Sequence, residues 1–166
     1  MVDSGQKWCY NGITLKKGVG EVYSFNGRFS ARLDEKNRMR IPAKFKEDLG
    51  KGYKLALGPN ECILVLPFSE YKKVMDSFGE VSIFDAEAQE AIAEFTGTVF
   101  DVTEDGQGRI LLCSELREYA GIDKDIVITG AATHLRIEPA ERYAGQSAKR
   151  NVSALYAKLN SLGKQA

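Results

Sequence analysis

Apolar and polar residues alternate over residues 28–33, where residues such as Phe29 and Leu33 are separated by polar side chains. Alternation with a period of two is typical of a strand that buries one face. A polar turn at residues 34–37 follows, and the pattern then predicts a short strand over residues 38–41. This part of the chain is therefore expected to form two strands joined by a tight turn.

The same criteria predict a mixture of further strands and helices. Pro42 suits the first turn of a helix, because the N–H group that it lacks would have no partner there. Gly50 can close that helix, and Asp85 is a suitable N-cap for a later one. The further predicted elements are a helix to about residue 49, strands over 53–57 and 61–66, helices over 68–78 and 85–94, strands over 99–103 and 109–112, a helix over 114–119, strands over 125–129 and 134–137, and a tail helix over 140–162.

A repeated turn indicates that this order of elements occurs twice. The turn at residues 34–38 recurs at residues 105–109 with an offset of 71 positions, and each copy begins with Asp and ends with Arg. Asn37 corresponds to Gly108, and Asn and Gly are the residues that most readily adopt positive φ. Internal repetition of this kind indicates two copies of one module.

Each module has only about 45 residues, close to the smallest size at which one hydrophobic core is sufficient. We therefore expect the two modules to share one core around a pseudo-two-fold axis, which would place the two turns symmetrically. Alignment just before the second turn is loose, so the register of the strand over 99–103 stays open. The matches beyond the turns pair Ile41 with Leu112, Phe45 with Leu116, Gly50 with Gly121, Leu55 with Ile126, and Leu57 with Ile128.

Positive charge is concentrated in the first module, although 23 basic and 23 acidic residues give the whole chain a formal charge of zero. The corresponding stretch of the second module has only Arg109 and Arg117 against five carboxylates. Clustered charge is evidence of a polyanionic partner, and a solvated strand face is the alternative. The basic residues between positions 27 and 50 are Arg28, Arg32, Lys36, Arg38, Arg40, Lys44 and Lys46.

The arginines that end the two turns are the main candidates for DNA contact. A guanidinium that leaves a tight turn points outward, where its fork can bridge phosphate oxygens or a guanine edge. Arg38 and Arg109 hold this position, and Asp34 and Asp105 are placed to orient them. An ion pair that only pins each turn is the alternative, and both roles can coexist. Residues suited to phosphate contacts, each of which also fits a solubilising charge, are Arg28, Arg32, Lys36, Arg40 and Lys44.

The two modules resemble those of MraZ proteins. The first carries the likeness in RLDEKNRMRIPAKF at residues 32–45, and the second in DGQGRILL at 105–112, LREYAG at 116–121 and IVITG at 126–130. The likeness covers about residues 25–143. MraZ proteins in turn resemble the AbrB-type DNA-binding superfamily but carry two modules per chain. Departures from the family pattern are Asn37 in place of Gly, Cys113 in place of Pro, and no Trp at residues 135–139.

The resemblance implies an α+β, β-rich fold in which two swapped-hairpin AbrB-type modules form a pseudo-symmetric double-split β-barrel with linker and C-terminal helices. It implies a cytoplasmic, nucleoid-associated transcriptional regulator that assembles as a ring-shaped homo-oligomer. The expected partner is double-stranded promoter DNA, as repeated boxes upstream of the bacterial division and cell-wall gene cluster. Family DNA contacts correspond here to the turns Asp34–Arg38 and Asp105–Arg109.

The expected division of the chain follows the repeat. We expect an N-terminal extension over 1–24 with weak order, a first module over 25–72, a helical linker over 73–96, a second module over 97–143 and a helical tail over 144–166. One hypothesis is that the extension is translated ribosome-binding DNA and that the natural start is Val22. The linker, with Phe84, Ile92 and Phe95, is the expected contact surface between copies.

Signals of an enzyme are weak in this sequence. His134 has no Cys, Asp or Glu at metal-ligand spacing, and no Gly-rich phosphate loop is present. We therefore expect no catalytic activity, cofactor, metal or small-molecule substrate. Three cysteines without a CxxC spacing favour a reduced cytosolic protein, and no apolar run reaches the ~20 residues of a membrane span. Two alternatives to a MraZ-like regulator stay open. One is another AbrB-type regulator or antitoxin, and the other is a scaffolding oligomer that does not bind DNA.

Overall fold

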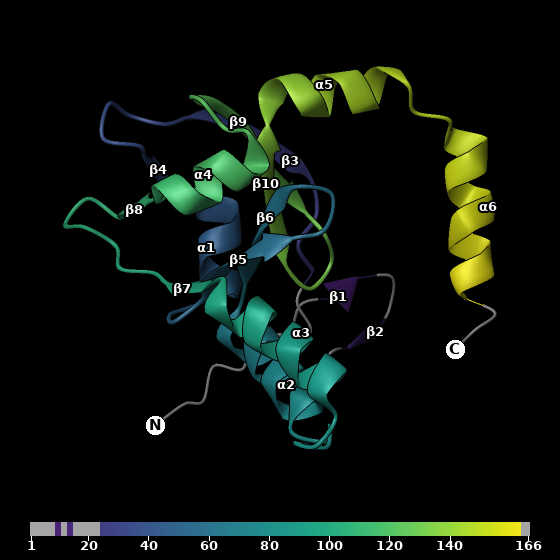
Figure 1. Cartoon of the computed structure of the whole chain (residues 1–166). Helices are drawn as coiled ribbons and strands as arrows, with labels where there is room; N and C mark the ends of the chain where they lie inside the picture. Colours follow the sequence, from purple (N-terminus) through teal and green to yellow (C-terminus); the bar gives the residue numbers. More distant parts are fainter. Residues whose placement is uncertain (1–8, 11–12, 15–23, 164–166) are drawn as a thin grey trace, which may run out of the picture.

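Strands and helices follow one another in the order that the sequence pattern predicts, which confirms a mixed α+β fold (Figure 1). The computed structural model describes residues 9–10, 13–14 and 24–163. The strands are β1 Cys9–Tyr10, β2 Ile13–Thr14, β3 Arg28–Arg32, β4 Arg38–Arg40, β5 Lys54–Gly58, β6 Cys62–Leu66, β7 Val99–Asp101, β8 Arg109–Leu111, β9 Asp125–Gly130 and β10 Leu135–Pro139. The helices are α1 Ala43–Leu49, α2 Phe68–Phe78, α3 Ala86–Gly97, α4 Ser114–Ala120, α5 Ala140–Ala148 and α6 Val152–Leu162.

The prediction of one continuous tail helix over residues 140–162 is wrong. The helix is interrupted after Ala148, so that α5 and α6 are separate. Asn151 caps the second helix, because its side-chain oxygen accepts a hydrogen bond of 3.0 Å from the amide of Ala154. The hydrogen bond gives the amide of Ala154 a partner at the start of a new helix. This cap explains why the chain leaves the helical conformation between α5 and α6. The strand predicted over 99–103 is also shorter and ends at Asp101.

The expectation of weak order in the extension concerns residues that lie mostly outside the described part of the chain. Within it, Cys9–Tyr10 and Ile13–Thr14 pair as the two short antiparallel strands β1 and β2. The described chain resumes at Ser24, next to Phe25, which forms an isolated bridge with Ala132.

The first strand of each module pairs with a strand of the other module. In the six-stranded sheet, of order β3-β9-β10-β6-β5-β7, β3 lies beside β9 at one edge and β7 lies beside β5 at the opposite edge. A separate antiparallel ladder joins β4 to β8, so that Met39 is opposite Ile110. At the centre of the sheet β6 also pairs with β10, so four strand pairings interleave the two modules.

The two edge pairings differ in register. Arg32 is opposite Asp125 in the first, whereas Lys54 is opposite Asp101 in the second. Asp101 corresponds through the 71-residue offset to Ser30 and not to Arg32, so the second pairing is displaced by two positions. This displacement explains why the two modules align poorly just before Asp105.

One hydrophobic core contains side chains of both modules, which confirms that they share it. Phe45 and Leu116, which correspond through the repeat, are both buried in this cluster, as are Leu55 and Ile126. Full burial of such a side chain contributes about 1.5–3 kcal/mol. The core holds the strands that lead into and out of the two turns.

Helix ends agree with the residue types that the sequence supplies. Gly50 and Gly121 follow α1 and α4 with φ of 66° and 65°, a conformation that suits Gly. Asp85 caps α3 as predicted, since its side chain accepts a hydrogen bond of 3.1 Å from the amide of Ala88. None of the helices in the described ranges combines the length and the apolar character needed to span a bilayer.

Candidate nucleic-acid interface

The two repeated turns have the same hydrogen-bond pattern. In the first, Asp34 Oδ1 accepts from the backbone amides of Lys36 and Arg38, both at 2.9 Å. In the second, Asp105 Oδ1 accepts from the amide of Gln107 at 2.9 Å and from that of Arg109 at 3.0 Å. An Asp at the start of a turn stabilises it in this way by replacing a backbone acceptor.

The backbone shape predicted from Asn37 and Gly108 is confirmed. Their φ angles are 58° and 70°, both in the left-handed region. The amide of each also donates to the carbonyl oxygen of the Asp three positions earlier, at 3.0 Å in the first turn and 2.9 Å in the second. Few side chains other than those of Asn and Gly tolerate this conformation, so the residue types follow directly from the turn.

Each arginine is held by the aspartate of its own turn. Arg38 Nε donates to Asp34 Oδ2 at 2.9 Å, and Arg109 Nε donates to Asp105 Oδ2 at 2.8 Å. The ion pair that was the alternative explanation of these residues is therefore present. It also fixes the direction of each guanidinium, which a DNA-contacting role would require.

Arginines and aspartates also pair across the two turns. Arg38 Nη1 lies 3.3 Å from Asp105 Oδ2, and Arg109 Nη1 lies 3.6 Å from Asp34 Oδ2. We refer to these four residues as the arginine–aspartate cluster. Their side chains are between 25% and 32% exposed. The β4–β8 ladder brings the turns together, and Figure 1 shows both loops projecting from the same side of the molecule.

Hydrogen bonds stabilise the ionised form of both aspartates of the cluster. The backbone amide of Arg38, followed by its side chain, lowers the pKa of Asp34 below the ordinary value. The amide and side chain of Arg109 likewise lower the pKa of Asp105 to about 2. The cluster thus contains two positive and two negative groups, and its own charges cancel.

Free positive charge next to the cluster comes from Lys36 and Arg40. Both side chains are largely solvent-accessible, and neither forms a hydrogen bond or ion pair within the described part of the chain. The corresponding positions of the second module are Gln107 and Leu111, and Leu111 is 58% exposed. The first turn therefore carries more unpaired positive charge than the second.

Three other candidate residues have partners away from the cluster. Arg32 pairs with Asp125 at 2.9 Å, and Lys44 Nζ donates to the backbone and side-chain oxygens of Asn26 at 3.1 and 3.0 Å. Arg28 lies at the end of β3 far from the turn, where its Nη1 donates to the Tyr143 hydroxyl at 3.2 Å. The structure brings the remaining six together: Asp34, Lys36, Arg38, Arg40, Asp105 and Arg109.

Lys124 holds the first turn from the opposite module, and sequence reasoning missed it. Its Nζ donates to the backbone oxygen of Asp34 at 3.1 Å and to Asn37 Oδ1 at 2.9 Å. The partly buried ammonium therefore fixes both ends of the loop. Nothing local in the sequence marks Lys124, because its partners are some 90 positions earlier, with separations of 90 and 87.

The second turn is held from the first module by a different set of side chains. Tyr53, which corresponds to Lys124 in the repeat, donates its hydroxyl to Glu104 Oε1 at 3.0 Å, and Lys46 Nζ donates to Glu104 Oε2 at 2.8 Å. The hydrogen bond from Lys46 is the main cause of a lowered pKa of Glu104. Burial, followed by the neighbouring Glu104, raises the pKa of Tyr53. The charge of Lys46 is thus neutralised beside the second turn.

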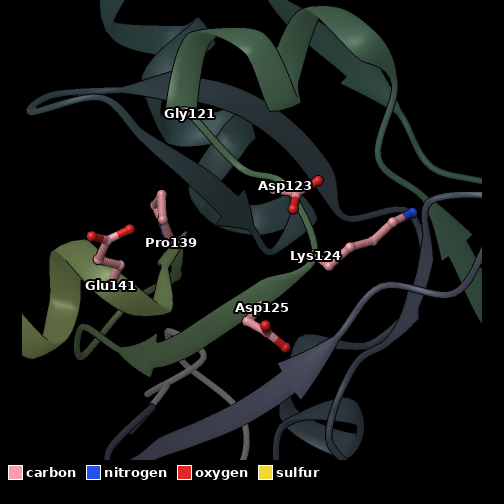
Figure 2. A pocket seen from close by; sticks show the side chains of 6 residues that line it. All are labelled: Gly121, Asp123, Lys124, Asp125, Pro139 and Glu141. Carbon is pink, nitrogen blue, oxygen red and sulfur yellow. The ribbon is translucent and has the colours of Figure 1, made fainter.

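A recess beside α4 and α5 is lined by Gly121, Asp123, Lys124, Asp125, Pro139 and Glu141. Figure 2 shows that Asp123, Asp125 and Glu141 point in different directions and that Lys124 points away from the recess. No three His, Cys, Asp or Glu side chains in the described ranges are arranged to hold a metal ion. Burial lowers the pKa of His134, and its Nδ1 lies 3.2 Å from Thr133 Oγ1.

Comparison with known proteins identifies relatives of this chain. The family model described as MraZ protein, antitoxin-like, matches it twice, at residues 24–92 and 95–159. The transcriptional regulator MraZ of Micrococcus luteus is 35% identical over 119 residues, which cover 72% of this chain and 83% of the relative. The protein of the same name from Bifidobacterium longum is 34% identical over 111 residues, covering 67% and 74% of the two chains. That from Clostridium acetobutylicum is 31% identical over 140 residues, covering 84% and 99%.

Proposed function

The chain belongs to the MraZ family, whose curated members are named transcriptional regulators, and we propose that it binds DNA sequence-specifically through the turns at residues 34–38 and 105–109. The observation that carries this proposal is the pairing of two equivalent turns on one side of the molecule. Each ends in an arginine whose guanidinium is already oriented by an aspartate. A guanidinium oriented in advance loses little conformational freedom when it binds an acceptor.

The lengths of the ion pairs suggest how DNA is engaged. The hydrogen bonds within each turn are 2.9 and 2.8 Å long, whereas the ion-pair distances between the turns are 3.3 and 3.6 Å. The Nη1 atoms of Arg38 and Arg109 are therefore the more weakly held ends. A guanine edge or a phosphate replaces the aspartate of the opposite turn at these atoms, while Nε keeps the bond to the aspartate of its own turn.

The nearest phosphate contacts come from two cations whose side chains have no partner among the described residues. Lys36 and Arg40 lie beside the cluster and supply affinity without sequence preference. Arg32, Lys44 and Arg28 provide further contacts at a distance from the turns, after exchange of their present partners. This division assigns sequence reading to Arg38 and Arg109 and the positioning of the DNA to the other basic residues.

The family relationship extends the proposal to assembly and target. We infer a pseudo-symmetric double-split β-barrel, an architecture supported by the exchange of β3 and β7 between modules. Two modules, over 25–72 and 97–143, flank a helical linker. The chain forms a ring-shaped homo-oligomer that binds repeated promoter boxes upstream of the division and cell-wall gene cluster. Its place is the cytoplasm, in association with the nucleoid.

A gel-shift titration tests the proposed function. Wild-type protein is titrated with the DNA upstream of its own gene and with scrambled DNA at one salt concentration. Arg38→Ala should lose discrimination between the two DNAs, whereas Lys72→Ala, which removes an exposed charge paired with Asp76 on α2, should keep it. Equal affinity of the wild-type protein for both DNAs would contradict sequence-specific binding.

An antitoxin function is the second candidate, favoured by the antitoxin-like description of the family model. An antitoxin binds both DNA and a toxin protein, and DNA binding alone is therefore compatible with it. Growth of cells from which the protein is depleted separates the two, because loss of an antitoxin releases a toxin and halts growth. A scaffolding oligomer without DNA binding would show neither a gel shift nor retention on heparin.

A further inference from the structure

Helix α6 buries none of its residues against the rest of the described chain. Every residue from Val152 to Leu162 is exposed, and Figure 1 shows the helix standing apart from the sheet and the other helices. A single helix of 11 residues is only marginally stable in water. Its stability therefore requires a surface that lies outside the described fold of one chain.

The exposed apolar side chains of α6 lie on one side of the helix. They recur at spacings of three and four positions, which form a single stripe in an α-helix. Lys158 flanks this stripe, and the chain contains no acidic residue from Arg142 to its last residue. The surface is therefore apolar with a positive border. The stripe consists of Val152, Leu155, Tyr156, Leu159 and Leu162.

The loop between α2 and α3 carries a second exposed apolar surface, with the opposite charge. Ile83 is 77% exposed and Phe84 is 90% exposed, so that together they form an apolar tip. The loop is held in shape by Ser82, whose hydroxyl accepts from the amide of Phe84 at 3.2 Å. No lysine or arginine occurs between Val74 and Gly108. The acidic residues closest to the tip in sequence are Glu80, Asp85 and Glu87.

We propose that α6 of one copy of this chain docks on the α2–α3 tip of another copy. The two surfaces match in being apolar at the centre and in carrying opposite charges at the border. The tip lies within residues 24–92, which the family model matches, and α6 lies within its second match, residues 95–159, as far as Leu159. The inference rests on the homo-oligomer of the proposed function and names the surfaces that would join its copies.

The contact joins two different surfaces, so it is heterologous. Each copy offers one helix and one tip, and successive copies therefore join head to tail until a ring closes. Figure 1 places the two DNA-contacting loops on the side away from α6, and the α2–α3 tip lies below them. Assembly through these surfaces leaves the arginine–aspartate cluster of every copy open to DNA.

Two double variants test the proposal by removing one surface each. Leu155→Asp with Leu159→Asp places charges in the helix stripe, and Ile83→Asp with Phe84→Asp places them in the tip. All four positions are exposed, so circular dichroism should show that both proteins fold. Ala154→Asp with Ala157→Asp, on the other side of α6, is the matched control. By light scattering, the control should assemble like the wild type, and each surface variant should have the 18.4 kDa mass of one chain.

Mixing the two surface variants in equal amounts gives the decisive measurement. The tip variant retains an intact helix, and the helix variant retains an intact tip. One helix–tip interface can therefore form between them, but a third chain cannot be added. The mixture should therefore contain a species of two chains and nothing larger. An α6–α6 contact would instead leave the tip variant assembled like the wild type, and this result would overturn the proposal.

Two further outcomes would also overturn the proposal. A wild-type protein with the mass of one chain would mean that α6 docks on a different protein. If both surface variants keep the mass of one chain in the mixture, the helix of one copy does not bind the tip of another. Light scattering without DNA is independent of the gel shift, and so failure of this contact is distinguishable from failure of DNA binding.

Discussion

Arg38 of the first module and Asp105 of the second lie within 3.3 Å of each other, from Nη1 to Oδ2. The reciprocal pair, Arg109 and Asp34, is separated by 3.6 Å. The two turns that carry the candidate DNA contacts are therefore in direct electrostatic contact and do not act as independent loops. A substitution in one turn is expected to change the position of the arginine in the other.

Arg38→Ala and Arg109→Ala should both weaken DNA binding. Loss of a bidentate base contact reduces binding by about 1–3 kcal/mol for each turn engaged. Arg38→Ala should be the more severe, because the side chains of Lys36 and Arg40 are unpaired within the described ranges, whereas Lys46 beside the second turn is paired with Glu104. Arg38→Lys should restore binding only in part, since an ammonium cannot replace the fork.

Urea unfolding is the control for these variants, because it shows whether a loss of DNA binding comes from a loss of stability. Because the pairs are partly exposed, each alanine variant should lose less than about 1 kcal/mol. If Arg38→Ala unfolds much earlier and still distinguishes the promoter from scrambled DNA, Arg38 has only a structural role.

Binding should depend strongly on salt. If about four to eight phosphates are contacted by each bound unit, affinity should fall by orders of magnitude between low and physiological salt. Lys36→Ala should reduce the slope of log affinity against log salt, because its exposed ammonium pairs with none of the residues that the structure describes. A slope near zero for the wild-type protein would contradict phosphate contacts.

Stability should fall in acid partly because of Asp105. The pKa of this carboxyl is about 2 in the folded protein, against an ordinary value of 3.8. A lowered pKa in the folded state adds stability above the ordinary pKa, and this contribution is lost as pH falls toward 2. Asp105→Asn removes the carboxyl, so its free energy of unfolding should fall less steeply below about pH 4.

Urea unfolding at several pH values measures this difference. Glu90→Gln, at an exposed position of α3, is the matched control and should keep the wild-type dependence on pH. An Asp105→Asn protein as sensitive to acid as the wild type would show that the hydrogen bonds of the second turn contribute little.

Lys124→Met should weaken DNA binding without changing its dependence on salt. The ammonium holds Asp34 and Asn37 and has no proposed phosphate contact, so its loss should loosen the first turn and misplace Arg38. Gel shifts at several salt concentrations separate the two effects. A reduced salt slope would show instead that Lys124 contacts phosphate directly.

Gly108→Ala should destabilise the protein by about 1–2 kcal/mol, because φ at this position is 70° and an L-residue is strained there. Gly106→Ala, two positions earlier, is the matched control. Its added Cβ would meet nothing within 4 Å, and its φ is not in the positive range. Gly106→Ala should therefore have a stability within about 0.5 kcal/mol of wild type. Equal effects of the two variants in thermal unfolding would contradict this account of the second turn.

Features that depend on neighbouring residues were predictable from the sequence. The repeat, the order of strands and helices, and the positive φ of Asn37 and Gly108 all follow from local patterns. The break before α6 belongs to the same class, since Asn151 is a favourable N-cap. It was missed because the apolar spacing continues on both sides of it.

Features that join distant residues were decided only by the tertiary structure. The sequence contains Arg38, Asp105 and Lys124, but the contacts among them and the first turn depend on the pairing of β4 with β8 and of β3 with β9. Equivalent positions of the two modules even hold the turns differently. Lys124 bonds directly to the first turn, whereas Tyr53 bonds to Glu104 beside the second. A periodic pattern specifies which face of each strand is buried, whereas the choice of partner strand depends on how the whole core packs.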